Sequence, residues 1–276
     1  MMHDRQTQPL DMAGGDPSSV LRKVQLILES FGPDDEQLGL TEIARRAGVP
    51  KASVYRLAQE LIRWGLLERR GSGYLLGIRL FELGQRVPRH RILHGAARPY
   101  MEDLHHATGE TIHLGVLDGR EVLYLEKVYG HEFVPLPSRV AGRMPLHCTA
   151  TGRVLLAFGP RELQDEVLVP PLPRLTRYTV VSPTTLAREL EQVRKNGHAL
   201  ESEQTRAGWA SVAVPLTGPS GTIMGALSVT APTYRARKNI NKYVQLLRMV
   251  TNQVEKTIRE GSQGAHLGSP PVRKAL

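Results

Sequence analysis

One set of side chains in this sequence has the types and the spacing that reading DNA requires. Lys51, Tyr55, Arg56 and Gln59 recur at helical spacing, so they share one face of a helix, opposite its apolar stripe. In the major groove of DNA, arginine and lysine pair with guanine edges and glutamine pairs with adenine. We therefore predict that this face enters a major groove; the alternative is an ordinary solvated helix face.

The sequence around this face is rich in side chains that could bind phosphate groups. Hydroxyl and guanidinium groups hydrogen-bond phosphate oxygens, which fixes the register of a protein on the duplex without reading bases. The stretch from Arg45 to Arg70 is strongly basic, with only two acidic residues. The predicted DNA-binding set beyond the four residues above is Thr41, Arg45, Arg46, Ala52, Ser53, Arg69 and Arg70.

A second set of side chains, later in the chain, favours a small-molecule pocket. Ser228 and Thr230 are two residues apart on a predicted strand, so they face the same side of its sheet. Thr149 and Thr151 stand at the start of a predicted helix, where free backbone N–H groups favour an anion. We predict a small polar or carboxylate ligand. The alternative is that these hydroxyls only cap a helix and satisfy strand ends.

The sequence supports a catalytic function less well than it supports DNA and ligand binding. His147 and Cys148 are adjacent, so their side chains diverge, whereas a Cys-His nucleophile pair must converge. His105 and His106 are also adjacent, which favours a helix surface over a zinc site. We predict no enzyme activity, no cofactor and no metal. The alternative is an enzyme that carries a winged helix for autoregulation.

Three predicted helices and a hairpin position the DNA-reading face. An apolar stripe predicts a first helix over 20–31, and a second helix over 41–47 ends at Gly48. Gly48 can adopt the left-handed conformation that reverses the chain after a helix. The third helix begins at Pro50. Two short apolar strands flank a glycine-rich turn at 71–73, and such a hairpin beside a helix-turn-helix is a wing.

The second set of side chains needs a sheet and several helices to bring it together. The turn signal Asp118-Gly119 separates two strand patterns and predicts a hairpin. Strands grouped with helices in this way predict an antiparallel sheet covered by helices, an α+β domain. Strands are predicted over 111–117, 121–128, 198–203, 211–216 and 223–231, and helices over 93–104, 149–158, 184–195 and 240–258.

Composition limits the class of protein. The chain has 276 residues, 41% of them hydrophobic, which suits two globular domains. Its net charge of +9 favours a polyanionic partner. A single cysteine excludes an intramolecular disulfide, and no apolar run approaches the roughly 18 residues of a membrane span. With no signal sequence at its polar start, we expect a cytoplasmic protein with no membrane partner.

Three phrases, in order along the chain, resemble the IclR family of bacterial regulators. The resemblance runs from about Val20 to Pro232 and implies a GAF-like effector domain behind the winged helix. The first phrase matches the family's helix-turn-helix, the second closes its wing, and the third lies at the mouth of its effector pocket. These phrases are Leu40–Leu57, Tyr74–Leu80 and Arg143–Arg153.

The resemblance implies further pocket residues. Ala150 and Thr151 match the helix start near the ligand, and Glu201 matches an acidic position. Ser211 stands where the family commonly has a cysteine, and Trp209 is bulkier than the usual aliphatic residue. The predicted effector-binding set is Phe133, Leu136, Thr149, Ala150, Thr151, Glu201, Trp209, Ser211, Ser228 and Thr230.

We therefore predict a ligand-responsive transcription regulator of class α+β, an N-terminal winged helix-turn-helix joined by a linker helix to an effector-binding domain. It would bind a near-palindromic operator in double-stranded DNA as a homodimer or a dimer of dimers. Repression and activation both stay open. The predicted parts are a disordered arm over 1–17, the winged helix-turn-helix over 18–77, the linker helix over 78–91, the effector domain over 92–260 and a disordered tail over 261–276.

Overall fold

The computed structural model describes residues 19–131 and 136–264, which form two compact units divided between Val87 and Pro88. Each unit has a hydrophobic core of its own. The predicted arm over 1–17 lies outside the described residues, as does the predicted tail after residue 264. No helix described here is both long enough and apolar enough to cross a membrane.

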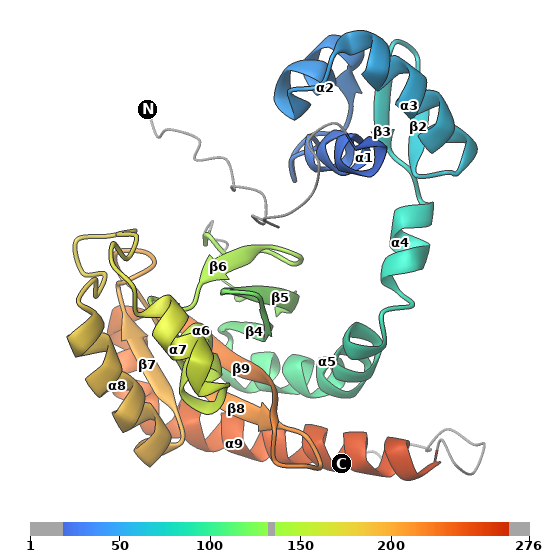
Figure 1. Ribbon diagram of the computed structural model, residues 1–276. Helices are drawn as coiled ribbons and strands as arrows, with labels where there is room; N and C mark the ends of the chain where they lie inside the picture. The colour runs from blue at the N-terminus through green and yellow to red at the C-terminus, as the bar shows by residue number, and fades with distance from the viewer. Residues whose placement is uncertain (1–18, 132–135, 265–276) are drawn as a thin grey trace. The chain divides into compact units, whose positions relative to one another are not determined.

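Three helices and a small sheet form the core of the N-terminal unit (Figure 1). Ile27, Ile43 and Leu61, one from each helix, are fully buried, so each apolar stripe faces the same core. The helices are α1 (Val20–Glu29), α2 (Leu40–Ala47) and α3 (Lys51–Arg63). The antiparallel strands, in the order β1-β3-β2, are β1 (Leu38–Gly39), β2 (Leu67–Arg70) and β3 (Gly73–Leu76).

Gly48 builds the turn between α2 and α3. Its φ of 63° and ψ of 26° lie in the left-handed region, which a glycine adopts without the strain of a Cβ. The N–H of the next residue, Val49, donates to the carbonyl of Ala44 at 3.2 Å, and the Val49 side chain is buried between the helices. The sequence prediction of a helix-turn-helix is confirmed at this turn.

The C-terminal unit is built on one six-stranded antiparallel sheet in the order β6-β5-β4-β9-β8-β7. The order places β4 and β9, far apart in the sequence, side by side at the centre, with Ser228 opposite His113. The strands are β4 (Thr111–Asp118), β5 (Glu121–Val128), β6 (Arg143–Pro145), β7 (Ala199–Ser202), β8 (Trp209–Thr217) and β9 (Ile223–Pro232).

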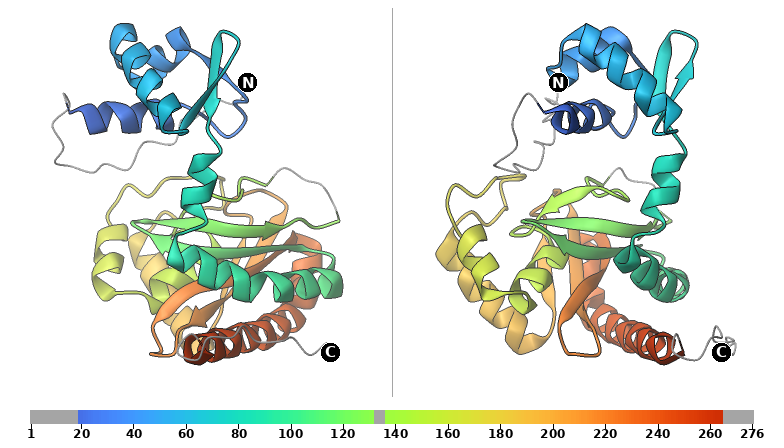
Figure 2. Two further views of the ribbon diagram at one scale, coloured as in Figure 1. Left: turned by 90° about the vertical axis from the view of Figure 1, so that its right-hand side faces the viewer. Right: turned by 45° about the vertical axis from the view of Figure 1, so that its right-hand side comes forward.

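Helices cover both faces of this sheet (Figure 2). On one face, α5 (Pro88–Thr108) and α9 (Thr233–Gly264) pack side by side, and Met101 and Leu247 are fully buried there. On the other face, α6 (Ala150–Phe158) and α8 (Pro183–Asn196) pack together, with Leu155 and Leu190 buried. A short helix, α7 (Arg161–Val167), follows α6.

The predicted linker helix over 78–91 is not one helix. Helix α4 (Arg79–Gly84) ends in a turn at 85–87, and α5 begins afresh at Pro88. The reason is Pro88, whose ring disfavours a helical conformation at the residue before it. The prediction of one helix came from the resemblance to the family rather than from residue spacing, so it did not take this local restriction into account.

The last helix is longer than the sequence pattern predicted. It begins at Thr233 rather than 240 and continues to Gly264, so the disorder predicted from 261 is wrong for 261–264. The glycine, serine and proline content from Gly261 onward predicted disorder, but a glycine within a helix costs only about 1 kcal/mol, which a long helix can absorb. The short elements β1, β6 and α7 were also missed, because two to seven residues are too few to show a period.

Candidate nucleic-acid interface and ligand cavity

Helix α3 separates its two faces as the sequence predicted. Val54 and Leu57 are buried in the unit's core, whereas Tyr55 is 50% exposed and Lys51 and Arg56 are exposed beside it. Ala52 is also exposed, and Ser53 and Gln59 are half-buried at the margins of the face. The Gln59 amide nitrogen is shielded from solvent with no acceptor among the described residues. The accessible donors of this face are therefore those of Lys51, Tyr55 and Arg56.

The exposed face of α3 carries positive charge that the rest of the unit does not neutralise. Within the described part of the chain, no carboxylate lies in ion-pair range of Lys51 or Arg56. By contrast, Arg63 at the end of the same helix pairs with Glu60 at 3.0 Å. An unpaired cation on a rigid helix can contact a polyanion without first breaking an ion pair.

Arg45 and Arg46, predicted to hold phosphates, are both engaged within the unit. The Arg46 guanidinium pairs with Asp35 at 2.5 Å and with Glu42 at 2.6 Å, and it donates to the Ser30 carbonyl at 3.1 Å. Arg45 donates to both oxygens of Glu42, at 2.6 and 2.8 Å. These hydrogen bonds, first from Arg45 and then from Arg46, lower the pKa of Glu42 to about 2. Arg46 therefore ties α2 to the loop before it.

The remaining predicted phosphate ligands lie at the start of α2 and in the wing. Thr41 is exposed in the first turn of α2. Arg69 and Arg70 are exposed on β2, where the Arg69 Nε donates to the Gly71 carbonyl at 3.3 Å. The structure thus brings one group of exposed donors onto α3 and another onto the hairpin.

A cavity in the C-terminal unit lies where the start of α6 meets the central strands of the sheet. Its volume is about 30 Å³, well below the roughly 300 Å³ at which small-molecule sites begin. Of the predicted effector-binding residues, all line this cavity except Phe133, which lies outside the described residues, and Trp209. Trp209 is the first residue of β8, one strand period before Ser211, which places it beyond the cavity.

The N-terminus of α6 supplies free backbone donors to the cavity. The Thr149 hydroxyl caps this helix by accepting from the Gly152 N–H at 2.9 Å, and it donates to the Pro145 carbonyl at 3.0 Å. The N–H groups of Ala150 and Thr151 have no acceptor in the part of the chain described. Two unpaired N–H groups at a helix start form an anion site.

Gly115 lets α6 approach the sheet this closely. A Cβ at that position of β4 would stand 2.6 Å from Thr151 Cγ2 and 2.8 Å from Val122 Cγ1. Both neighbours are branched side chains in a packed core, so neither can move aside without strain. The absence of a side chain at Gly115 therefore fixes where Thr151 faces the cavity.

Side-chain hydroxyls line the cavity as two hydrogen-bonded pairs. Thr151 Oγ1 donates to Ser228 Oγ at 3.1 Å. Ser211 Oγ and Thr230 Oγ1 are hydrogen-bonded at 2.9 Å across β8 and β9. Because Ser228 and Thr230 lie on one face of β9, both pairs border the same space.

An imidazole that the sequence analysis did not single out extends the second pair. His113 Nδ1 lies 3.5 Å from Thr230 Oγ1, and its Nε2 is hydrogen-bonded to Ser138 Oγ at 2.8 Å. Burial lowers the pKa of His113 to about 3, with a further contribution from the charge of Lys127. The ring is therefore neutral and can offer a hydrogen bond without a charge.

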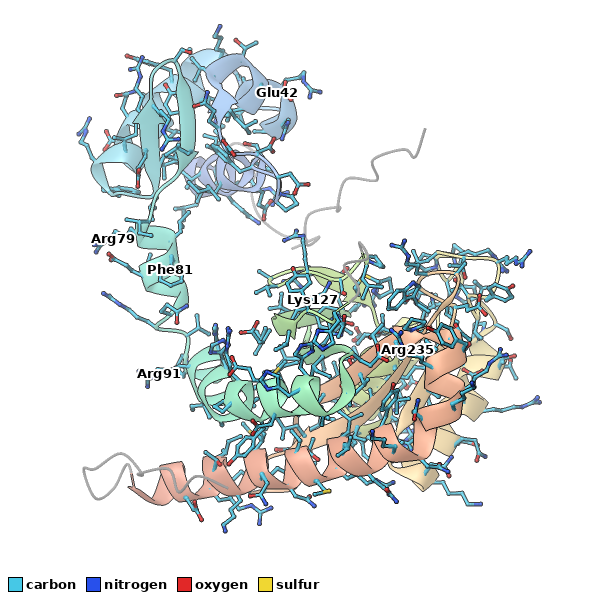
Figure 3. The ribbon with its side chains drawn as sticks, turned by 180° about the vertical axis from the view of Figure 1, so that it is seen from behind. Glu42, Arg79, Phe81, Arg91, Lys127 and Arg235 are labelled. Carbon is cyan, nitrogen blue, oxygen red and sulfur yellow. The ribbon has the colours of Figure 1, made fainter. Side chains whose placement is uncertain are left out.

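Lys127 fixes the wall behind His113. Its ammonium donates to the Ser138 carbonyl at 2.7 Å and lies 4.7 Å from the centre of the Tyr129 ring. Figure 3 labels Lys127 beside the green strands of the C-terminal unit. Burial lowers its pKa to about 8, and the contact holds the residues before β6 against β5.

Six cavity-lining residues were missed by sequence reasoning. They come from the β4–β5 hairpin, from β6 and the segment leading into it, and from the turn after β7. The alternation of side chains predicts which residues of one strand share a face. It does not predict the register between β4 and β9, which are paired although more than a hundred residues separate them in the sequence. The residues are His113, Tyr124, Pro137, Ser138, Met144 and Thr205.

Glu201 places a carboxyl with an unusual proton affinity at the cavity. It is 1% exposed, and burial raises its pKa to about 7. One oxygen accepts from the Gln204 N–H at 3.0 Å, which opposes part of this shift. Near neutral pH a substantial share of Glu201 is therefore protonated and able to donate as well as accept.

Replacing Glu201 with glutamine is expected to stabilise the protein more at pH 8 than at pH 5. With its pKa raised to about 7, Glu201 holds its proton more tightly in the folded than in the unfolded chain. The resulting stability is full below the ordinary pKa and is lost as the pH rises to about 7. The advantage of the variant should grow by about 2–3 kcal/mol between these pH values. Urea unfolding measures it, and an advantage that is equal at both pH values would contradict the buried ionisation.

The groups considered for catalysis are placed elsewhere. Cys148 is fully buried, and burial raises the pKa of its thiol to about 12, so it is not a nucleophile at neutral pH. The His147 ring is hydrogen-bonded to the Pro173 carbonyl at 2.8 Å. Among the described residues, no cluster of histidine, cysteine and acidic side chains could hold a metal ion.

Comparisons with known proteins match both units. A family model described as the bacterial transcriptional regulator IclR C-terminal domain matches residues 85–256, and one of the IclR helix-turn-helix domain matches residues 20–71. The HTH-type transcriptional regulator KdgR of Dickeya chrysanthemi is 34% identical over 249 residues, 89% of this chain and 81% of the relative. The HTH-type transcriptional regulator XynR of Escherichia coli (strain K12) is 35% identical over 226 residues, 79% of this chain and 87% of the relative.

A solved structure extends this likeness to three dimensions. The crystal structure of an IclR homolog from Microbacterium hydrocarbonoxydans, complexed with 4-hydroxybenzoate, superposes with a TM-score of 0.82. The two proteins are 35% identical, and the superposition covers 88% of this chain and all of the other.

Proposed function

Because this chain belongs to the IclR family of bacterial transcriptional regulators, we propose that α3 reads its operator and that the cavity at α6 binds its effector. The chain is a transcription regulator with an N-terminal helix-turn-helix and a C-terminal ligand-binding domain. The proposal adds which residues perform each task. One observation carries it: the exposed face of α3 holds cations that no carboxylate of the described chain neutralises.

We propose that Lys51, Tyr55 and Arg56 lie in the major groove, with phosphates held at its rims. Arg56 and Lys51 would pair with guanine edges, because they are the free cations of this face. Thr41, Arg69 and Arg70 would hold phosphates. Arg46 is left out of this set because its guanidinium is committed to Asp35, Glu42 and Ser30.

The proposed effector is a small carboxylate that also bears a hydroxyl group. Its carboxylate would accept from the N–H groups of Ala150 and Thr151, and its hydroxyl would meet the neutral His113 and Thr230. The relative that binds 4-hydroxybenzoate supports this chemistry and supplies a probe.

Such a ligand requires the cavity to change shape. A volume of about 30 Å³ is far smaller than a hydroxybenzoate, so binding must move part of the wall. A ligand that binds the widened form better shifts the protein toward it, and that differential affinity is what regulation requires. The proposed response is therefore a change of operator affinity that follows widening of the cavity.

The proposal includes a homodimer, or a dimer of dimers, on a near-palindromic site in the cytoplasm. One winged helix contacts too few bases and phosphates for tight binding. The chain around α4 offers an apolar surface for a second copy: Ile78 is 66% exposed, Phe81 62% and Val87 49%. Figure 3 shows Phe81 projecting from α4. Exposed apolar residues grouped on one element are typical of an interaction surface.

The test is footprinting of the full-length protein on its own upstream DNA, with and without 4-hydroxybenzoate. The expected result is a protected site with two related halves, whose protection changes with the probe. Chromatography of the probe after incubation separates regulation from the alternative enzyme, since a regulator returns it unchanged. A chain that protects no DNA, or that converts the probe, would overturn the proposal.

A further inference from the structure

Helix α9 carries a basic face that the proposed function does not use. One side of α9 packs on the sheet and on α5, where Tyr243 and Leu247 are buried. The other side lies on the outside of the C-terminal unit, where Figure 2 draws α9 in red. Between Thr233 and Val254 the helix has no acidic residue. The basic face of α9 consists of its exposed donors Arg237, Lys238, Asn241, Lys242, Gln245, Arg248 and Asn252.

These donors lie together because their spacing follows the helical period. From Lys238 to Asn252 the exposed donors recur after every three or four residues. The cations from Arg237 to Arg248 extend over roughly 17 Å, at about 1.5 Å per residue. Duplex DNA carries one negative charge per about 1.7 Å of its axis, so a basic face of this length meets several phosphates.

Three cations of the basic face are unpaired. In the chain as described, no carboxylate lies in ion-pair range of Arg237, Lys238 or Lys242, and no group hydrogen-bonds to them. By contrast, Arg235 lies outside the basic face and pairs with Glu110 at 2.8 Å. Lys238 and Lys242 stand one turn apart, and like charges at this spacing destabilise a helix. A bound polyanion would relieve that repulsion.

The composition of the basic face favours phosphates over a protein or a membrane. Protein interfaces are enriched in aromatic residues and depleted in lysine, whereas Met249 is the one large apolar side chain exposed between residues 237 and 252. A membrane-bound helix buries its apolar face in lipid, but that face of α9 is already buried in the core of its own unit. Arginine, lysine, asparagine and glutamine are side chains that contact phosphate oxygens in DNA complexes.

We propose that the basic face of α9 binds the phosphates of duplex DNA outside the operator. The same chain carries a DNA-binding unit, so duplex DNA is present at high effective concentration whenever the operator is bound. Contacts to phosphates carry no sequence information, so they add affinity for any neighbouring duplex. The proposal rests on operator binding by the N-terminal unit, but not on which residues of α3 read the bases. The DNA is either the flank of the operator duplex or a second duplex.

The test uses the full-length protein in gel-shift titrations with three duplexes. The first is the operator alone, as footprinting defines it. The second is the operator extended on both sides by several helical turns. The third is an operator-free duplex, added to the complex with the first or to the protein by itself.

Two variants with equal loss of charge are compared. The α9 variant is Arg237→Gln, Lys238→Gln and Lys242→Gln, which keeps the helix because glutamine has nearly the helix propensity of lysine and arginine. The matched control removes three exposed cations on α7, on α8 and in the segment between them. Its substitutions are Arg161→Gln, Arg174→Gln and Arg188→Gln.

We expect the wild type to bind the extended duplex about tenfold more tightly than the operator alone, or to recruit the operator-free duplex into a larger complex. The first result identifies the flank as the ligand, and the second identifies a second duplex. The α9 variant should lose this gain, and the slope of log affinity against log salt concentration should fall by about 3 per protomer. The control should keep the gain, and both variants should bind the operator alone within about threefold of the wild type.

Three results overturn the proposal: no gain in the wild type, the same loss in both variants, or a gain that the α9 variant keeps. Binding to vesicles of phosphatidylserine and phosphatidylcholine that only the α9 variant loses, without a gain on DNA, would assign the basic face to a membrane instead. A wild type that does not bind the operator alone contradicts the proposed function. In that case the operator-free duplex decides, since binding that only the α9 variant loses supports the basic face and absence of binding overturns it.

Discussion

Replacing Arg56 with alanine is expected to remove specific operator binding from a protein that stays folded. Arg56 is exposed on α3 and makes no ion pair within the described chain. A bidentate contact between arginine and guanine is worth about 1–3 kcal/mol. A dimer loses two such contacts, so affinity should fall about thirtyfold or more. Gel-shift titration at fixed salt measures it.

Arg63→Ala is the matched control for this prediction. Arg63 lies on the same helix and is equally exposed, but it pairs with Glu60 and follows the predicted groove-facing residues. Its loss should leave operator affinity within about threefold. Equal weakening by both substitutions would mean that general positive charge, rather than a base contact, binds the operator.

The helix-turn-helix could be predicted from the sequence because each of its signals is local. Gly48 ends α2 in the left-handed conformation, and the stripe from Val54 to Leu61 separates the buried from the exposed face of α3. Each feature depends on residues a few positions apart. The ion pairs of Arg46 were not predicted, because its partner Asp35 lies in a loop whose path has no periodic signal.

For the ligand cavity, too, the residues with a local signal could be predicted and the others could not. Ser228 and Thr230 could be placed together because the strand period is two residues, and Thr149 because it precedes a helix. His113 and Ser138 could not, since their contact requires β4, β9 and the segment before β6 to meet in one register. The break at Pro88 could have been predicted, because a proline restricts the residue before it, but the linker helix over 78–91 followed from the resemblance alone.

The four side-chain hydroxyls of the cavity satisfy one another, whereas the N–H groups at the start of α6 do not. Thr151 is bonded to Ser228, and Ser211 to Thr230, so no side-chain atom of these four is left unpartnered. A ligand must therefore replace these bonds rather than fill empty ones. The cavity is therefore selective, because a molecule without matching hydroxyl or carboxylate groups would break these hydrogen bonds without forming new ones.

Exchange of Ser228 for alanine together with Thr230 for valine should abolish the response to 4-hydroxybenzoate while operator binding survives. Valine has nearly the shape of threonine and alanine is smaller than serine, so neither strains the core around β9. Both hydroxyl pairs lose a member, and the ligand loses the Thr230 hydroxyl that the proposal gives it together with the Ser228 hydroxyl that lines the same space.

The loss of two hydrogen bonds should weaken binding of the probe by about 2–3 kcal/mol, a factor of roughly 30 to 140 in affinity. Calorimetry measures the binding, and footprinting without the probe measures what is left of DNA recognition. Thr222→Val is the control, since Thr222 is exposed just before β9 and outside the cavity. If the double variant bound 4-hydroxybenzoate as tightly as this control, the probe would occupy another site, and the hydroxyl pairs would be structural supports of β8 and β9 alone.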